Sequence, residues 1–267
     1  MATPLVPDDL WEAIAPLLPA QPPKPQGGRP RVPDRAALGG ILFVLRTGAG
    51  WESLPRELGC GSGMTCWRRL RDWQAAGVWD RLHRAVLDRL GEADKLDWSR
   101  ASLDSASVPA KRGARKRAAT PPTAASPGPS ATWMVDGRGV PLAALLSPAN
   151  RHDSLFLEPL LDAVPPVRTP SGRRRRRPAK LHADKGYDDR KCRAACRRRR
   201  IKHRIARRGI EAGDRLGRHR WVVERTLAWL NRLRRLAVRY ERRADIHRAF
   251  LLLGCSLVCL RRPEGRF

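Results

Sequence analysis

The chain has 267 residues, of which 54 are lysine or arginine and 26 are aspartate or glutamate, so its formal net charge is +28. A charge of this size favours nucleic acid as the partner and argues against an acidic protein. No run of about 18 apolar residues is present and the first residues lack a secretory signal, so we expect no membrane-spanning helix and a cytoplasmic location.

The charge is divided unequally along the chain. Residues 1–95 carry 13 basic and 11 acidic side chains, whereas residues 96–267 carry 41 and 15. Because the two parts must have different surfaces, we expect two domains with different tasks, and the length is sufficient for both.

The first part contains a series of predicted helices. Apolar residues at helical spacing mark them, with aspartates at their starts and prolines or glycines at their ends. In chain order we expect a helix that begins at Asp8 or Asp9, a linker at 22–31, a helix from Asp34 to Gly48, a short helix at 54–59, a glycine turn at 59–63, and helices at 64–74 and 78–90.

A short helix, a glycine turn and a basic helix in this order are typical of a helix-turn-helix. In this interpretation Arg68, Arg69 and Arg71 contact DNA. The alternative is a plain helical hairpin in a small bundle, since the surrounding charge is nearly neutral. We therefore expect residues 1–95 to form an all-helical, helix-turn-helix-like DNA-binding domain.

The second part mixes strand and helix patterns, which predicts an α/β (α+β) domain with a mixed sheet at 96–267. In chain order we expect a strand at 101–108, a mobile loop at 111–130, a hairpin formed by 133–136 and 140–146 around Gly137-Arg138-Gly139, a helix at 154–163, a charged loop at 173–177, a strand at 181–184, a helix at 190–199, a strand at 203–206, a long helix at 218–239 and a buried helix at 251–260.

The six cysteines form no C-x-x-C pair. Cys192 and Cys196, like Cys255 and Cys259, are four residues apart and share a helix face. We therefore expect buried thiols, with a structural zinc site as the weaker alternative.

Three acids lie where carboxylates could serve phosphodiester chemistry. That chemistry commonly uses two divalent cations about 4 Å apart, and hard cations prefer oxygen ligands. Asp104 lies within a predicted strand, Asp184 ends another, and Glu224 lies on the long helix. Between Arg190 and Arg243 there are 21 basic residues and four acids, so Glu224 needs either an arginine or a metal ion as its partner.

Each acid also has a simpler interpretation, which the spacing leaves open. On a 3.6-residue period Glu224 shares a polar stripe with Arg220, Asn231 and Arg235, so it could pair with Arg220 one turn away. Asp104 could begin a turn, and Asp184 could stabilise the bend that follows it. The remaining nearby candidates are interpreted as turn or capping residues: Asp136, Asp188, His152 and Asp153.

Several motifs together resemble one known family. They are Leu103 to Val108, Ala149 to Ser154, Ala183 to Asp188, Gly217 to Thr226 and Arg239 to His247, preceded by Gly28 to Arg31 and Trp51 to Pro55. In this order they resemble the DDE transposases of the IS5 group of bacterial insertion sequences, and the resemblance covers nearly the whole chain.

The resemblance implies an RNase H-like catalytic domain with Asp104, Asp184 and Glu224 as its acidic triad. It implies two Mg²⁺ ions between these residues, which Mn²⁺ could replace. The ions would activate water to cut the terminal inverted repeats of the element, and the freed 3′-hydroxyl would then attack target DNA. The expected partner is double-stranded DNA, bound by a homodimer or higher oligomer.

The same resemblance bears on the basic residues around the glutamate. Arg220 matches the arginine of a signature in the related IS4 group, but the tyrosine and lysine positions of that signature are Gly217 and Asn231 here. We expect Arg218, Arg220 and Arg225 to bind the DNA backbone.

One segment departs from the family pattern. Residues 126–133 contain no basic residue, where relatives carry a glycine and a strand with lysine or histidine. The activity of this copy is therefore left open. The alternatives are a non-catalytic DNA-binding protein, such as a decayed transposase or a helix-turn-helix regulator, and an RNase H-like nuclease without strand transfer.

Overall fold

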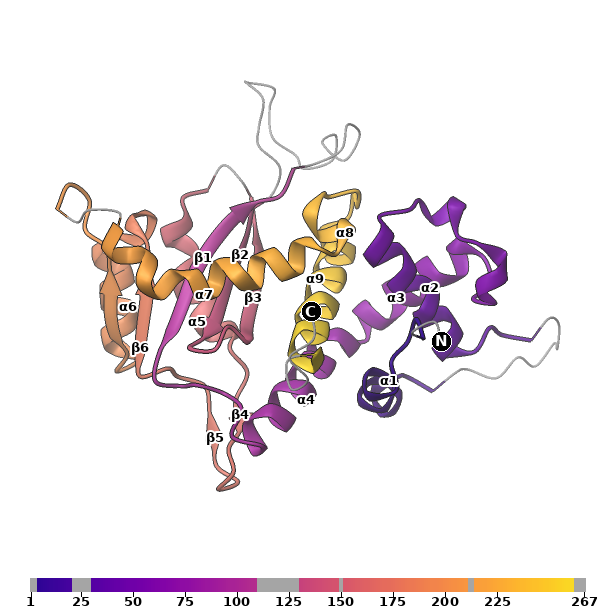
Figure 1. The fold of residues 1–267 in the computed structure, drawn as a ribbon, viewed down its shortest axis with the longest axis horizontal. Helices are drawn as coiled ribbons and strands as arrows, with labels where there is room; N and C mark the ends of the chain where they lie inside the picture. The colour runs from indigo at the N-terminus through magenta and orange to yellow at the C-terminus, as the bar shows by residue number, and fades with distance from the viewer. Residues whose placement is uncertain (1–3, 21–29, 110–129, 149–150, 211–213, 262–267) are drawn as a thin grey trace.

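The computed structural model describes residues 4–20, 30–109, 130–148, 151–210 and 214–261, with the side chains of 214–220 excepted (Figure 1). Residues 111–129 of the loop predicted at 111–130 and residues 22–29 of the linker predicted at 22–31 lie outside the described part, whereas Ser130 begins a strand.

The amino-terminal part is helical, as predicted. Helix α3 is capped by Ser62, whose hydroxyl accepts a hydrogen bond from the Thr65 amide at 3.2 Å. Helix α2 ends at Gly48, which adopts a positive φ of 75° that glycine favours. The elements are α1 (Asp8–Ile14), η1 (Ala15–Leu17), α2 (Asp34–Thr47), η2 (Trp51–Ser53), η3 (Arg56–Leu58), α3 (Gly63–Ala75) and α4 (Val78–Glu92).

The second part is built on a five-stranded mixed sheet. Its strands are β1 (Ala101–Ser107), β2 (Ser130–Asp136), β3 (Pro141–Ser147), β6 (Lys180–Ala183) and β7 (Lys202–Ile205), in the order β3-β2-β1-β6-β7. The first three form an antiparallel meander, and β6 and β7 run parallel to β1. The predicted hairpin turn is confirmed at Gly139, where φ is 87°.

Helices cover both faces of this sheet. Helix α7 (Asp214–Asn231) crosses β1 and β2 at a steep angle on one face. On the other, α5 (Leu157–Ala163) packs against β2 and β3, preceded by the short turn η5 (Asp153–Phe156). Helix α6 (Arg190–Arg198) follows β6 and the turn η6 (Lys185–Tyr187), and it packs against β7. The mixed α/β architecture predicted from the sequence is therefore confirmed.

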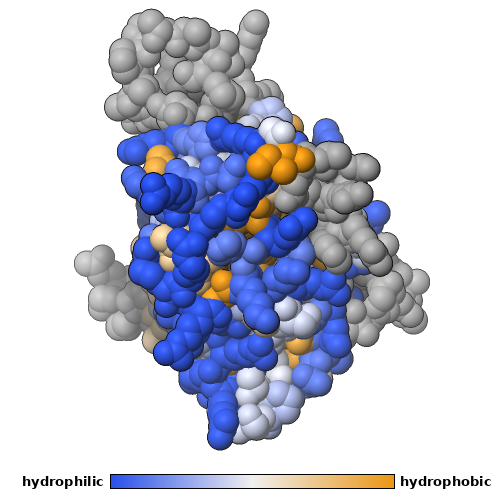
Figure 2. Space-filling model, turned by 90° about the vertical axis from the view of Figure 1, so that its left-hand side faces the viewer, coloured by the Kyte–Doolittle hydropathy of each residue, from blue (hydrophilic) through white to orange (hydrophobic). Residues whose placement is uncertain are grey.

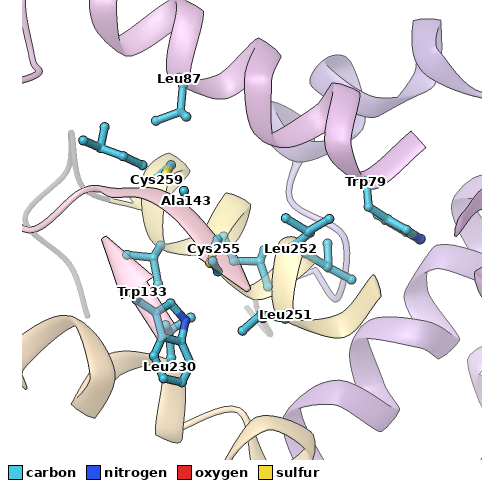
Figure 3. Close-up of a cluster of buried hydrophobic side chains, with 14 of the residues drawn as sticks. Trp79, Leu87, Trp133, Ala143, Leu230, Leu251, Leu252, Cys255 and Cys259 are labelled. Carbon is cyan, nitrogen blue, oxygen red and sulfur yellow. The ribbon is translucent and has the colours of Figure 1, made fainter. Parts of the chain in front are cut away.

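The last helix, α9 (Ala244–Arg261), lies between the two parts of the molecule. It packs against α3 and α4 on one side and β3 on the other. Figure 3 shows Leu251, Leu252 and Cys255 of α9 among side chains from α4, β2, β3 and α7. One continuous cluster of buried side chains thus extends through both parts, and the division at residue 95 stays a prediction.

The predicted long helix at 218–239 is interrupted. Helix α7 ends at Asn231, and α8 (Arg234–Ala237) follows after Leu233, whose ψ of 100° is extended. The break lets α8 pack against α2, with Arg235 and Leu236 buried. Arg235 is therefore not on a polar stripe with Glu224, and tertiary packing overrides the continuous helical pattern.

A second difference concerns the charged segment at 173–177. It was expected to be a loop, but β5 (Arg174–Arg175) pairs antiparallel with β4 (Val167–Arg168) to form a short hairpin. The prediction of buried thiols is confirmed, since all six cysteines are free and buried. None of the described helices has the length and apolarity needed to cross a membrane.

A buried histidine on α9 predicts how stability depends on pH. His247 is only 1% exposed, its Nδ1 atom has no hydrogen-bond partner among the described residues, and burial lowers its pKa to about 4. The neutral ring is therefore favoured in the folded state, whereas the unfolded chain protonates near pH 6.5. Stability is lost as pH falls below about 6.5, and the loss grows until about pH 4.

Between pH 7.5 and pH 5 the free energy of unfolding should therefore fall by about 2 kcal/mol less in His247→Leu than in the native chain. Urea unfolding at the two pH values measures the difference. His83 is also buried, with a pKa lowered by burial, so part of the pH dependence should remain. An unchanged pH dependence in His247→Leu, with exposed His152→Gln as control, would show that His247 is solvated or charged in the folded state.

Candidate active site

Two of the three predicted acids lie on neighbouring strands at the same level of the sheet. Strands β1 and β6 are parallel, with Ala101 opposite Leu181 and Ser102 opposite His182. The same register brings Asp104, in the middle of β1, level with Asp184, which directly follows the last residue of β6. Both side chains are half-buried. The structure therefore brings these two carboxylates together from positions 80 residues apart in the sequence.

Each aspartate also makes a local hydrogen bond. One oxygen of Asp104 accepts from the Ser105 amide at 2.9 Å, and Oδ1 of Asp184 accepts from the Gly186 amide at 2.9 Å. The second bond is the bend-stabilising role that the sequence left open for Asp184. A carboxylate has two oxygens and about four lone pairs, so neither bond prevents coordination of a cation.

A buried network of hydroxyl groups lies beneath the two aspartates. Ser105 bonds to Thr132 of β2 at 2.9 Å and to the hydroxyl of Tyr187 at 2.5 Å. Tyr187 is 1% exposed, and its pKa is raised by burial and further by Asp153, Asp184 and Asp104. The tyrosine hydroxyl therefore stays protonated and joins β1 at Ser105 to the turn after β6.

Asp153 is a residue that the sequence interpretation missed. It was expected only to cap the following helix, but its carboxylate accepts a hydrogen bond from Ser105. Burial raises its pKa, and the nearby charge of Asp184 raises it further. Its place beside Asp184 arises from contact between η5 and η6. Sequence spacing could not have shown this contact, because Asp153 follows a loop rather than a strand.

The other candidates also have local roles in the structure. His152 caps η5 by accepting a hydrogen bond from the Ser154 amide. Asp136 is fully buried and accepts from the amides of Asp97, Arg138 and Val140, which makes it a structural turn residue. Asp188 is paired with Arg193 at 2.5 Å.

Glu224 lies on α7, the helix that crosses both strands. Its neighbours Val222, Val223 and Thr226 are buried against the sheet. Arg225 donates to the Arg138 carbonyl at 2.7 Å, in the turn at the amino end of β1. Because successive helical residues are turned by about 100°, Glu224 points away from Arg225 and from the buried face of α7, on the outer side of the helix.

The side chain of Glu224 is nevertheless exposed. Among the described residues, no three histidine, cysteine or acidic side chains lie close enough together to hold a metal ion. The structure thus joins Asp104 to Asp184 and places Glu224 over the same sheet, without bringing its carboxylate into the pair.

The basic residues predicted to bind DNA have different environments. Arg225 is stacked between Trp221 and Trp229, with its guanidinium carbon 4.6 and 4.8 Å from the two ring centroids. Burial lowers its pKa. Arg218 and Arg220 lie on α7, but their side chains are outside the described part of the structure.

The three arginines of α3 also differ from one another. Arg68 is exposed. Arg69 forms an ion pair with Asp34 and donates to the Val32 carbonyl at 3.3 Å, so it joins α3 to α2. Arg71 pairs with Asp72 at 2.7 Å and stacks on Trp67. Of the three, Arg68 is the side chain most accessible to a phosphate.

The order of the sheet, the paired aspartates and the crossing helix agree with a match to a known family. A family model described as "Transposase DDE domain" matches residues 99–259. The chain belongs to the DDE transposases. A second model, described as "Putative transposase of IS4/5 family", matches residues 6–83 of this transposase. The IS4/IS5 resemblance, the RNase H-like fold class and the assignment as a DNA transposase are therefore confirmed.

Two proteins of Burkholderia cepacia are similar to the transposase. One, named "Insertion element IS402 uncharacterized 16.2 kDa protein", is 58% identical over 136 residues, which are 49% of this chain and 91% of that protein. The other, named "Putative transposase for insertion sequence element IS402", is 49% identical over 155 residues, 57% of this chain and 74% of that protein.

The transposase also aligns with a solved structure, the pre-cleavage Mos1 transpososome. The alignment covers 92% of this chain and 83% of the other at 12% identity. Its TM-score of 0.27 is too low to transfer any residue or contact.

Proposed function

We propose that Asp104, Asp184 and Glu224 are the acidic triad of the transposase and bind the divalent cations of its reaction. The register of two parallel strands, which brings Asp104 of β1 level with Asp184 at the end of β6, carries this proposal. Their donors are carboxylate oxygens, which suit Mg²⁺, with Mn²⁺ as a substitute. When bound, the cations supply activation of water and stabilisation of the leaving oxygen.

The protein's own residues hold this arrangement. The hydrogen bond between Tyr187 and Ser105 holds the middle of β1 against the turn that follows β6. Glu224 completes the triad by turning from its exposed position on α7 toward the two aspartates.

The DNA steps follow from this site. Water attacks the phosphorus at the end of the element, the bond to the 3′ oxygen breaks, and a 3′-hydroxyl and a 5′-phosphate are formed. The 3′-hydroxyl then attacks a phosphodiester of target DNA in a transesterification that again releases a 3′-oxygen. The basic surface of residues 96–267 holds the phosphates of both duplexes.

The remaining assignments belong to the same proposal. Residues 1–95 form the domain that recognises the terminal inverted repeats, with Arg68, Arg69 and Arg71 near DNA. Residues 96–267 form the catalytic domain, with Arg218, Arg220 and Arg225 on the DNA backbone. The transposase works in the cytoplasm, as a homodimer or higher oligomer on paired ends.

Incubation of the native chain with linear DNA that carries the ends of the element tests this function. We expect cleavage at the ends in Mg²⁺ or Mn²⁺ and none in EDTA, with end binding preserved in both conditions. The affinity should fall by about 10³-fold or more between 50 and 200 mM salt. Binding without cleavage in either cation would instead identify a non-catalytic DNA-binding protein.

A further inference from the structure

The hairpin formed by β4 and β5 lies at the end of the sheet opposite the paired aspartates. It lies at the lower edge of the molecule in Figure 1. The hairpin leads into Lys180, the first residue of β6, which is level with Lys202 of β7. Four residues of β-strand separate Lys180 from Asp184, about 13 Å at 3.3 Å per residue.

Five consecutive arginines, 173–177, are all exposed on this hairpin. Their recorded hydrogen bonds go to neutral carbonyl groups. Arg174 bonds to Pro166, Arg175 to Trp98, Arg176 to Asp162 and Arg177 to Arg199. None of the ion pairs between described residues uses a side chain from 173 to 177. The charge of this segment is therefore uncompensated by carboxylates.

Arginines nearby show the contrast. Arg168 of β4 pairs with Glu92, and Arg199 pairs with Asp162 at 2.8 Å. Carboxylates are thus available next to the hairpin and are used by other arginines. The five hairpin charges are left for a polyanion outside the chain.

The cationic surface continues beyond the hairpin. The bond from Arg177 to the Arg199 carbonyl, 3.1 Å long, joins its base to the end of α6. There a shallow hollow of about 460 Å³ is lined by Arg197, Arg200, Ile201, Lys202 and His203. Figure 2, which faces the α6 side, shows a predominantly hydrophilic surface. We call residues 173–177 together with Lys180, Arg197, Arg200 and Lys202 the basic end of the sheet.

The backbone of the hairpin is fixed to the rest of the fold by several contacts, so it is in place before a ligand binds. Arg175 stacks on Trp98 with its guanidinium carbon 5.6 Å from the ring centroid. A second contact joins the hairpin to α4, because the amide of Arg168 donates a hydrogen bond to the side chain of Asp88 at 2.8 Å. The approach to α4 requires Gly91, because a Cβ atom there would lie 2.1 Å from the Arg168 carbonyl oxygen. Preordering lowers the entropy cost of binding.

The contact with α4 indicates which DNA this surface meets. The hairpin joins the sheet that carries the aspartates, and it contacts α4, a helix of the part that we propose recognises the ends of the element. A duplex that reaches from the cleaved bond toward the helical part belongs to the element itself. Lys180 is about 13 Å from Asp184, and the hairpin arginines precede it by a further three to seven residues, so the phosphates that they bind are not the scissile ones.

We propose that the basic end of the sheet is a second duplex-binding surface, which holds the phosphate backbone of the element's own DNA some base pairs inside the cleaved bond. This inference rests on the proposed function, since it takes cleavage at Asp104 and Asp184 as given. It assigns to the five-arginine hairpin a role in binding affinity and positioning, without sequence readout.

The test compares the native chain with the triple variant Arg173→Gln, Arg174→Gln and Arg176→Gln. These substitutions leave the stacked Arg175 and the bridging Arg177 in place. The control variant also loses three positive charges, but from arginines that already pair with carboxylates. Its substitutions are Arg35→Gln, Arg84→Gln and Arg243→Gln. Fluorescence anisotropy measures affinity for two duplexes that share the cleaved end, one about 10 base pairs long, a single helical turn, and one about four times longer.

We expect the triple variant to bind the longer duplex at least about tenfold more weakly, with the slope of log affinity against log salt reduced by about 3, one for each lost phosphate contact. Affinity for the short duplex and the affinities of the control variant should stay within about threefold of native. Equal loss on both duplexes, or no loss beyond that of the control, would overturn the proposal. The proposal would also be overturned if the triple variant bound DNA as the native chain does but had lost affinity for an acidic polypeptide, because the partner of the hairpin would then be a protein.

Two further measurements keep this test decisive. If the triple variant does not fold, Arg173→Glu alone should give the same length-dependent loss, because Arg173 is exposed next to the turn of the hairpin. Cleavage of the longer duplex by the native chain is measured in parallel. A native chain that cleaves while the hairpin variants bind normally would refute this inference alone, whereas a native chain that neither binds nor cleaves would refute the proposed function.

Discussion

Asp184→Asn is expected to lower the rate of end cleavage at least about 1,000-fold, equivalent to about 4 kcal/mol of transition-state stabilisation. The amide oxygen of asparagine can still accept the hydrogen bond from Gly186, so the turn after β6 should be preserved. What is lost is a negatively charged ligand for the cations. Asp104→Asn and Glu224→Gln should have similar effects, and double variants should be little worse than single ones because the residues act as a unit.

Single-turnover cleavage of end DNA, with binding measured separately, tests this expectation. Binding of the three variants should stay within about threefold of native, since phosphate contacts dominate affinity. Asp188→Asn is the matched control, because Asp188 is close in sequence but is paired with Arg193. Native cleavage rates in the triad variants, or an equal loss in Asp188→Asn, would refute the assignment of the triad.

Glu241→Gln is expected to destabilise the transposase by about 3–5 kcal/mol, because it leaves a buried cation without its counter-charge. Arg235 and Glu241 are 4% and 7% exposed, and they are joined by a bond of 2.8 Å. Arg235 also donates to the Ala49 carbonyl and stacks between Trp51 and Tyr240. The pair thus links α8 to the loop after α2, across the two parts of the molecule.

Urea unfolding measures this loss, and a double variant isolates its cause. Arg235→Met with Glu241→Leu removes both charges and should recover at least half of the stability lost in Glu241→Gln. The exposed pair Arg243 and Asp245 provides the control, since Asp245→Asn should cost less than about 1 kcal/mol. Equal losses for the buried and the exposed carboxylate would mean that Arg235 reaches solvent.

The sequence predicted most elements because their signals are local. Gly48 and Gly139 mark the end of α2 and the turn between β2 and β3 through backbone conformations that glycine favours. The apolar spacing in α3 and α4 and the alternation of strand and helix in the second part are likewise local. These signals were enough for the fold class, and the family motifs added the candidate triad.

The parts that the sequence did not predict depend on tertiary contacts. The break between α7 and α8 exists because burial of Arg235 beside Glu241 outweighs continuation of the helix. The β4–β5 hairpin depends on the close approach of Arg168 to Gly91. Asp153 joins the candidate site through its bond to Ser105, a partner 48 residues earlier in the chain. Periodicity carries no record of such distant contacts.

The central claim, that the acidic triad binds the cations of the reaction, is tested most directly by replacing one oxygen ligand with a sulfur ligand. In Asp184→Cys the oxygen donor becomes a thiolate, which binds Mn²⁺ better than the harder Mg²⁺. We expect this variant to bind end DNA normally and to cleave it at less than about 1% of the native rate in Mg²⁺. In Mn²⁺ its cleavage rate should be at least about tenfold higher than in Mg²⁺. Cleavage at the native rate in Mg²⁺ would contradict the claim that Asp184 is a metal ligand of the transposase.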